Sequence, residues 1–191
     1  MVIISEYDLN TIGESDFLCE SHETCTCPCC GGKLRYRDRR RRIKRSFGGT
    51  KCYLWLRRLI CLECRRLHLE LPDELVPRKH YSSEVIENVV DGVSTEEDES
   101  TEDYPCVDTM KRWKDWMEKS QVQIEGWLRS VGERLLGLGA ELLSTGDALL
   151  QILRERGAGW LGICMRVIYN TGGHLAPLSN APVLPGVPGE P

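Results

Sequence analysis

Residues 27–32 read C-P-C-C-G-G and residues 61–66 read C-L-E-C-R-R, so two C-x-x-C hooks stand 30 residues apart. Four thiolates delivered by two tight turns suit a closed tetrahedral zinc site, and Gly31 and Gly32 permit the positive φ angles of such a turn. A disulfide pair or a thioredoxin-like redox motif would use the same spacing. We favour zinc, and the ligands that this spacing predicts are Cys27, Cys30, Cys61 and Cys64.

The segments beside the hooks alternate between apolar and polar residues, as half-exposed strands do. Residues 33–37 and 52–57 alternate on either side of a turn at residues 48–49, and residues 67–71 alternate until Pro72. Hook, strand, turn, strand, hook and strand is the order of a zinc ribbon. So small a sheet buries little apolar surface, so we expect a structural zinc whose apparent binding energy of roughly 10 kcal/mol or more substitutes for a core.

Other potential ligands lie near the hooks. Cys25 and Cys29 could replace Cys27 or Cys30, but only the latter pair combines the two-residue spacing with a following Gly-Gly. His68 follows the second hook, and strand alternation predicts a surface position for it. The isolated cysteines, which we expect to be small buried hydrophobic residues, are Cys19, Cys52, Cys106 and Cys164. A rubredoxin-like iron site would use the same four sulfurs, but the basic surroundings favour zinc.

The net charge of −4 conceals a reversal of sign along the chain. Residues 31–66 contain 14 Lys or Arg against two acids, whereas residues 84–103 contain nine acids and no base. Attraction between exposed charges reaches about 8 to 10 Å at physiological salt, so the basic segment can bind a polyanion although the whole chain is acidic. The acidic run 94–103 reads as a linker; a sharper hypothesis is that it folds over the arginines and competes with DNA.

The densest positive charge falls in residues 39–45, which we place at a flexible tip between the first two strands. The candidate phosphate contacts there are Arg39, Arg40, Arg41, Arg42, Lys44 and Arg45. Each neutralised phosphate would release counterions, so affinity should fall steeply with salt; a solvated hairpin loop is the alternative. Tyr36, Tyr53 and Trp55 could stack on bases, but their alternation favours packing within the sheet.

Beyond Pro77 the apolar spacing becomes helical. Ser82 or Ser83 can cap a helix that Gly92 ends, and Asp108 can cap a second helix with Met110, Trp113 and Met117 on one face. The other faces carry three further candidate DNA contacts, Lys111, Arg112 and Lys114. The two helices suggest a helix-turn-helix unit.

The remaining chain is rich in leucine. From Gln121 to about Arg156 the spacing predicts two helices broken near residues 137–146, or one kinked helix, and residues 160–169 predict a short helix. This region could form a homodimer or bind a protein partner through residues 121–170. The final residues, rich in proline, are expected to be disordered.

Four stretches carry a family resemblance: residues 27–34, 56–72 (L-R-R-L-I-C-L-E-C-R-R-L-H-L-E-L-P), 76–87 (V-P-R-K-H-Y-S-S-E-V-I-E) and 108–116 (D-T-M-K-R-W-K-D-W). Over residues 25–118 the chain resembles a bacterial family of transposase-related proteins with an N-terminal zinc ribbon and a helix-turn-helix. The resemblance implies zinc ligation by the four hook cysteines and a recognition helix over residues 109–116. Related transposases continue into a core with three acidic metal ligands, and no such pattern follows here.

The sequence therefore predicts an α+β protein with five regions: a flexible leader (1–24), a zinc ribbon (25–78), a helix-turn-helix-like unit with an acidic insertion (79–118), a helical region (119–170) and a disordered tail (171–191). The favoured function is non-catalytic DNA binding as a regulator or mobile-element accessory. The alternatives are a zinc-ribbon adaptor that binds a protein through its Leu-rich helices and a truncated recombination enzyme. We expect no small-molecule substrate, and no secretory signal or membrane span is evident, so we expect a cytoplasmic protein.

Overall fold

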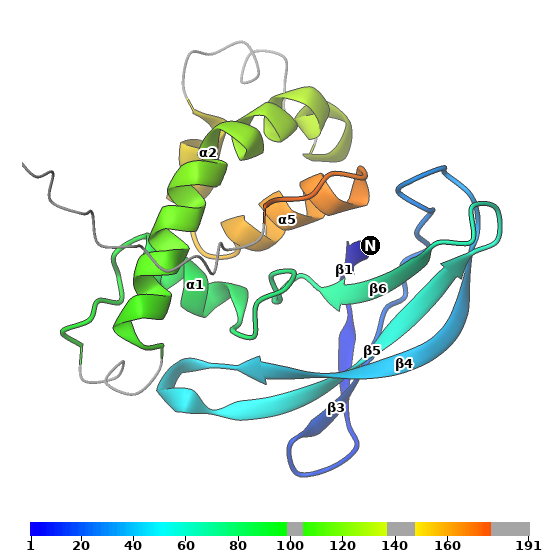
Figure 1. Cartoon of the computed structure of the whole chain (residues 1–191), viewed down its shortest axis with the longest axis horizontal. Helices are drawn as coiled ribbons and strands as arrows, with labels where there is room; N and C mark the ends of the chain where they lie inside the picture. Colours follow the sequence, from blue (N-terminus) through cyan, green and yellow to red (C-terminus); the bar gives the residue numbers. More distant parts are fainter. Residues whose placement is uncertain (99–104, 137–147, 177–191) are drawn as a thin grey trace, which may run out of the picture.

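The computed structural model describes residues 1–98, 105–136 and 148–176, and its fold is α+β. Helices pack together beside a strongly twisted sheet, and the long β4–β5 hairpin reaches from the hooks to α1 (Figure 1). The strands are β1 (Val2–Ser5), β2 (Asp8–Thr11), β3 (Asp16–Glu20), β4 (Leu34–Arg45), β5 (Lys51–Cys61) and β6 (Leu67–Pro72). The helices are α1 (Ser83–Val90), α2 (Val107–Leu136), α4 (Leu149–Glu155) and α5 (Trp160–Asn170), with a short 3₁₀ turn at Phe47–Gly49.

Strand β5 is the centre of the sheet. One of its edges pairs with antiparallel β4 along its whole length, from Leu34 opposite Cys61 to Arg45 opposite Lys51. The other edge is shared: β3 pairs in parallel with the start of β5, and β6 pairs antiparallel with its end. The sheet therefore splits along this edge, between Trp55 and Arg58, where one partner strand gives way to the other.

The expectation of a flexible leader is wrong for most of residues 1–24, because they supply β1, β2 and β3. β1 pairs in parallel with β6, so Val2 lies opposite Leu69, and β3 pairs in parallel with β5. These partners are far away in sequence, and a parallel pair leaves no hairpin signal between its strands. The side-chain amide of Asn170, at the end of α5, bonds both backbone groups of Ile4 at 2.7 and 2.8 Å.

The basic residues 39–45 do not form a flexible tip, since they lie within regular strand β4. Residues 46–50 make the turn, and Gly48 and Gly49 there have φ angles of 65° and 71°. The far end of the hairpin is attached to the segment before α1: Arg45 N–H donates to the His80 carbonyl at 2.8 Å, and Ser82 N–H donates to the Arg45 carbonyl at 3.0 Å.

The first helix follows the sequence prediction. Ser82 Oγ accepts a hydrogen bond from Val85 N–H, as an N-cap does, and Gly92 follows the helix with a φ of 73°. The second helix differs, because α2 runs unbroken over Val107–Leu136 and starts one residue before Asp108. No proline or glycine interrupts residues 110–125, and so nothing ends the helix after Met117.

The helices and the inner face of the sheet share one hydrophobic core. It includes Leu54, Leu56 and Leu71 from the strands, and Ile86, Trp113, Ile124, Leu128, Trp160, Leu161 and Ile168 from the helices, all of them buried. The predicted short helix near residues 160–169 is confirmed as α5. Residues 171–176, expected to begin a disordered tail, also pack here, since Leu175 is buried and Ala176 accepts a hydrogen bond from Trp116. The rest of the predicted tail lies outside the described residues.

Two carboxylates from neighbouring helices bind the N-terminal amides of α5 and α4. Glu87 on α1 accepts hydrogen bonds from Gly159 and Leu161 at 2.8 and 2.9 Å, and burial raises the pKa of its carboxyl group. Glu125 on α2 accepts from Leu149 and Leu150 at 2.9 and 3.0 Å. Neither α4 nor α5 has a capping side chain of its own, so these contacts satisfy amides that would otherwise lack acceptors.

The short turn of a helix-turn-helix is not present between α1 and α2. Such motifs join their helices through about three or four residues, whereas α1 ends at Val90 and α2 begins at Val107.

Among the described helices, none combines the length and apolar character that a membrane span needs.

Candidate zinc site and basic strand

The two hooks adopt the same local conformation. Within the first hook, Gly31 N–H donates to the Cys27 carbonyl at 2.8 Å and Cys27 N–H donates to the Gly32 carbonyl at 2.9 Å. In the second, Cys61 N–H donates to the Arg66 carbonyl at 3.0 Å. The residue after the last cysteine is left-handed in both, with φ angles of 72° at Gly31 and 60° at Arg65. Both hooks therefore turn their cysteine side chains to one point.

Close packing of one hook on the other requires a glycine. A Cβ added at Gly32 would lie 2.9 Å from Glu63 Cβ and 3.1 Å from Cys61 Sγ, closer than a side chain tolerates. The pair Gly31–Gly32 thus has two tasks, because the first glycine takes the positive φ and the second leaves space for the opposite hook.

The four predicted ligands come together. The sulfurs of Cys27, Cys30, Cys61 and Cys64 all lie within 4.8 Å of one another. Cys27 and Cys64 are separated by 3.7 Å, and Cys30 and Cys61 by 3.5 Å. A Zn–S bond of about 2.3 Å places the sulfurs of a tetrahedral site about 3.8 Å apart, so the cluster is compatible with one zinc ion.

Electrostatics distinguish Cys61 from the other three cysteines of the cluster, whose pKa values burial and hydrogen bonds to neighbouring sulfurs raise. Burial opposes ionisation of Cys61, but backbone N–H groups of Cys64 and Glu63 donate to its sulfur, and the balance lowers the pKa of Cys61 to about 7. Zinc binds thiolates and not thiols, so a thiol that ionises near neutral pH releases its proton to solvent at low cost when a metal ion binds. All ten cysteines lie in the described part of the chain and are free thiols.

His68 is not the surface residue that alternation predicted. Its side chain is 1% exposed, and Nε2 lies 3.4 Å from Cys27 Sγ. Burial, followed by the positive charges of the chain's N-terminus and Arg66, lowers the pKa of the imidazole, which keeps it neutral. Nδ1 is buried without a partner in the described chain, so the tautomer that carries its proton on Nε2 fits best. His68 then donates to the Cys27 thiolate, the kind of second contact that orients a metal ligand.

The isolated cysteines differ among themselves. Cys19 and Cys164 are buried as expected, and Cys52 is half-buried. Cys106 is exposed, contrary to expectation, because it precedes α2 at the surface.

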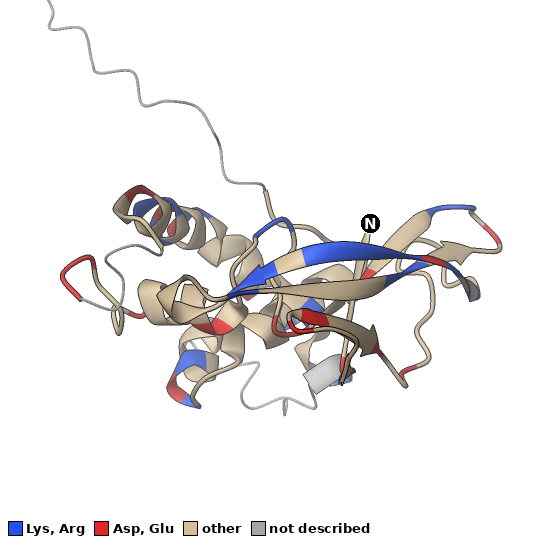
Figure 2. Ribbon diagram, turned by 90° about the horizontal axis from the view of Figure 1, so that it is seen from below, with Lys and Arg blue, Asp and Glu red and all other residues tan. Residues whose placement is uncertain are grey.

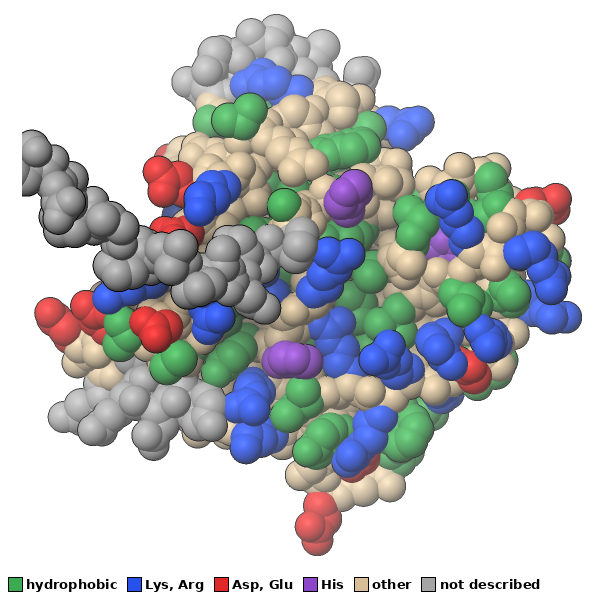
Figure 3. Space-filling view, viewed as in Figure 1, with side chains coloured by type: hydrophobic (Ala, Val, Ile, Leu, Met, Phe, Trp, Pro, Cys, Tyr) green, Lys and Arg blue, Asp and Glu red, His purple; other side chains and the backbone are tan. Residues whose placement is uncertain are grey.

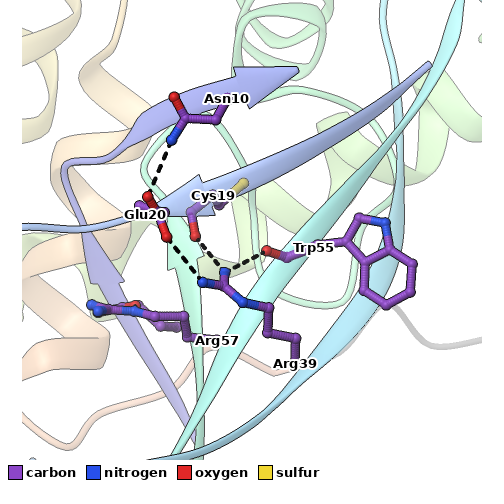
Figure 4. Close-up of polar contacts among 7 residues, drawn as sticks. Asn10, Cys19, Glu20, Arg39, Trp55 and Arg57 are labelled. Atoms are coloured by element: carbon purple, nitrogen blue, oxygen red, sulfur yellow. Dashed lines mark hydrogen bonds and ion pairs between the residues drawn. The ribbon is translucent and has the colours of Figure 1, made fainter. Parts of the chain in front are cut away.

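Arg39 has a structural task at the split of the sheet. Its guanidinium donates to the carbonyls of Cys19 and Trp55 and pairs with Glu20 at 3.1 Å (Figure 4). These contacts lie where β3 leaves β5, so Arg39 bridges the two strands at the end of their pairing, which is Leu18 opposite Trp55.

The next basic residues are also engaged within the fold. Arg41 donates two hydrogen bonds to Asp16 and lies 3.5 Å from the centre of the Tyr53 ring. Arg42 donates to the carbonyls of Val76 and Lys79, and burial lowers its pKa to about 10. These contacts join β3 and the segment 76–79 to β4.

Two further predicted phosphate contacts on β4 also interact with other parts of the fold. Lys44 pairs with Glu74 at 2.5 Å, and Arg45 holds the hairpin to residues 80–82 through its backbone. Arg40 differs from its neighbours, being exposed and without a hydrogen-bond or ion-pair partner in the described chain. Of the aromatic residues, Trp55 Nε1 donates to Asp16, whereas Tyr36 is 53% exposed.

Arg40 belongs to a basic face that the sequence analysis did not single out. Arg35 and Arg40 lie on the same side of the sheet as Arg42. Their partners on β5 are Ile60, Leu56 and Leu54, and these residues are an even number of positions apart, so they point to one side. Asp38, the one acid between them, is held by two hydrogen bonds from Arg58. The blue band along β4 in Figure 2, and the basic side chains grouped over it in Figure 3, show this concentration of charge.

The three predicted contacts on α2 are exposed, while the neighbouring Trp113 and Trp116 are buried. Lys111 lies 4.0 Å from Glu96, and Arg112 donates to the Asp108 carbonyl and Thr109 Oγ1. Lys114 has no partner among the residues that the structure describes. Glu96 belongs to the acidic run, whose described part thus contacts α2 and not residues 39–42; residues 99–104 lie outside the described chain.

The leucines whose side chains the structure describes on α2 and α4 face the core, while the side chains of Leu135 and Leu136 and all of residues 137–147 lie outside the described part of the structure. Ile124, Leu128, Leu149, Leu150 and Leu153 are all buried in the core. Val122, on the same helix as Leu128, is 84% exposed.

A family model described as a domain of unknown function, DUF6431, matches residues 27–113. The match contains both hooks, the β4–β5 hairpin, β6, α1 and the first turns of α2. No curated protein and no solved structure matches the chain. The chain is thus similar to this family from Cys27 to Trp113.

Proposed function

We propose that this protein is a non-catalytic nucleic-acid-binding protein, in which a structural zinc ion fixes one end of a sheet whose basic edge strand contacts DNA. The observation that carries the proposal is the pair of exposed arginines, Arg35 and Arg40, on one side of β4. Neither has a carboxylate partner in the described chain, whereas Arg39, Arg41 and Lys44 pair with Glu20, Asp16 and Glu74.

The zinc ion that this proposal assumes is held by Cys27, Cys30, Cys61 and Cys64. Four thiolates complete its coordination and leave no open position for water or substrate, so the ion would supply structure and not catalysis. Its effect on DNA binding would be indirect: Leu34 and Cys61 are paired, so the hooks fix the start of β4 and the end of β5.

The arginines on β4 also have a simpler explanation that an experiment must exclude. β4 is an edge strand, and charged side chains on such strands prevent pairing with other chains. That role would need only charge at the edge, without affinity for phosphate. DNA binding by α2, as part of a transposase-like front end, is the finer version of the proposal, and it rests on the exposed Lys111 and Lys114.

The test is a titration of duplex DNA at several salt concentrations with two double variants. Arg35→Ala with Arg40→Ala should weaken binding and lower the slope of log K against log salt by about 0.9 for each lost phosphate contact. Lys111→Ala with Lys114→Ala is the matched control for charge, and it should change the slope less if β4 is the principal contact. The reverse order would assign binding to the helix.

Absence of DNA binding by the zinc-loaded wild type at low salt would overturn the proposal. It would favour the adaptor function, and among the described leucines of α2 and α4 the partner would have to use a surface other than the buried ones. Metal-dependent strand cleavage would instead support an enzyme.

A further inference from the structure

We propose that a cavity beside the basic strand binds one phosphate-bearing nucleotide unit, with the phosphate at Arg78 and His174 and the base against the apolar wall. This inference deepens the proposed nucleic-acid binding and depends on it for its biological setting. The cavity has a volume of about 320 Å³ and is lined by Met1, Val2, Pro77, Arg78, Tyr169, Gly173 and His174.

The lining has the composition that a nucleotide needs. Arg78 and His174 are exposed side chains that can donate to phosphate oxygens, and no carboxylate lines the cavity. Val2, Pro77 and Tyr169 supply an apolar wall. Figure 3 shows histidine and basic side chains bordering hydrophobic ones near the middle of this face. A largely apolar cavity with a few polar groups at one side is the usual form of a small-ligand site.

Arg78 is held in place by a strained and well-anchored segment. Its φ of 65° is left-handed, a conformation that costs an arginine free energy and that persists where the surroundings impose it. Two contacts fix this segment. Arg42 donates hydrogen bonds to the carbonyls of Val76 and Lys79, on either side of Pro77 and Arg78. The Lys79 ammonium points inward and lies 3.8 Å from the centre of the Trp116 ring. The guanidinium of Arg78 has no partner in the described chain, although its backbone is fixed.

The opposite wall is equally rigid. Gly173 approaches Trp127 so closely that an added Cβ would lie 2.6 Å from its ring, and Gly172 would place a Cβ 2.7 Å from the Pro28 carbonyl of the first hook. The side-chain amide of Gln123 donates to the His174 carbonyl at 2.9 Å. The cavity is therefore already formed in the free protein.

Arg42 ties the segment that carries Pro77 and Arg78 to β4. Arg40 lies on the same side of β4 as Arg42, and Arg42 contacts both neighbours of Pro77 and Arg78. A strand bound along β4 can thus place an unpaired or terminal nucleotide at Arg78. A free nucleotide has the same chemistry, and the experiment separates the two sources.

The structure also supplies a matched pair of variants. Arg78→Gly removes the guanidinium and the left-handed strain together, so the variant should fold with a melting temperature at or above that of the wild type. Arg65→Gly makes the same change at the other left-handed arginine, which does not line the cavity. Any difference between them reports on the cavity and not on the loss of one positive charge.

Two measurements on the zinc-loaded full chain test the proposal. The first follows backbone amide shifts during addition of thymidine 5′-monophosphate, with thymidine and inorganic phosphate added separately. The nucleotide should change the amide chemical shifts of Val2, Gly173 and His174, and Arg78→Gly should weaken nucleotide binding at least tenfold.

The second measurement compares the affinity for a duplex with a 5′-phosphorylated single-stranded overhang and for a blunt duplex of equal length. The overhang should bind at least fivefold tighter, and Arg78→Gly but not Arg65→Gly should remove that preference.

The outcomes separate this inference from the proposed function. Shifts by the free nucleotide without any DNA binding would support the cavity with a free nucleotide as its ligand while overturning the function. DNA binding that ignores the overhang, together with unchanged amides during the nucleotide titration, would overturn the cavity proposal alone. An unchanged affinity in Arg78→Gly would also overturn it.

Discussion

The two ends of the sheet are held together in different ways. At the hook end, Cys27 and Cys61 are buried but lie outside the main hydrophobic cluster, and the contacts are sulfur to sulfur, sulfur to imidazole and backbone to backbone. At the other end, the sheet packs on helices through residues such as Leu54, Ile86 and Leu128. The comparison indicates that a metal ion at the hooks would not replace the core of the protein, because in the described chain the other end of the sheet has a hydrophobic core with the helices.

The largest expected effect follows from metal removal. Without zinc, four sulfurs held within 4.8 Å lose the ion that unites them, so the hooks should open locally. Amide exchange at Cys27, Gly31 and Cys61 should rise by about 1,000-fold on chelation, while Ile86 and Leu128 stay protected. Cys27→Ser should reproduce this pattern, and Cys25→Ser should not. Loss of protection at both ends in one transition would show that the ends are not independent.

The core end is tested by Leu128→Ala. Leu128 is 0% exposed, so its truncation should destabilise the fold by about 2 to 5 kcal/mol in chemical denaturation of the zinc-loaded protein. Val122→Ala, on the same helix but 84% exposed, should change stability by no more than about 0.5 kcal/mol. Equal effects of the two would contradict the assignment of this helix face to the core.

A pH-dependent effect is expected where the segment before α1 meets α2. Burial lowers the pKa of Lys79 to about 8, against 10.5 for an ordinary lysine. Between these values the unfolded chain holds the proton that the native state has released, so this group makes stability rise with pH. Lys79→Met removes the dependence. The stability advantage of the variant over wild type should therefore shrink by about 2 kcal/mol from pH 7 to pH 10. A constant difference across this range would show that Lys79 titrates normally.

The smallest expected effect concerns the carboxylates that bind helix amides. Glu87→Gln keeps one acceptor oxygen but places an NH₂ group against the second amide of α5, so it should cost about 1 to 3 kcal/mol. Glu125→Gln makes the same change at α4 in a less buried position and should cost less. Denaturation of both variants at pH 7 decides the order, and a larger loss in Glu125→Gln would be inconsistent with the burial of Glu87.

Local patterns predicted the elements that depend on neighbours in sequence. The hook spacing, the turn at Gly48 and Gly49, the end of β6 at Pro72 and the Ser82 cap each involve residues a few positions apart. Alternation also predicted β6, but a period of two defines two faces without saying which is buried. For this reason the sequence predicted a surface position for His68. In the structure β6 lies between β1 and β5, and the imidazole of His68 points to the first hook.

The basic cluster shows the same limit more sharply. Residues 39–45 contain six basic residues, and nothing in the sequence indicates which of them would contact a phosphate. The fold separates them, because side chains alternate along β4 and meet different neighbours. Arg39 and Arg42 satisfy carbonyls, Arg41 and Lys44 pair with acids, and Arg40 is left exposed. Arg78 lies outside this cluster, and nothing in the sequence distinguishes it from the adjacent Lys79, which the fold buries.

By itself, the sequence determined the two hooks, the hairpin between them and the first capped helix, since spacing, turn glycines and caps act through local geometry. Only the tertiary structure decided that residues 1–24 join the sheet, that α2 is one long helix in a shared core, and which arginines remain free. These features depend on parallel pairing, burial and charge neutralisation between residues far apart in the chain, and such contacts leave no regular pattern in the sequence that a local rule could detect.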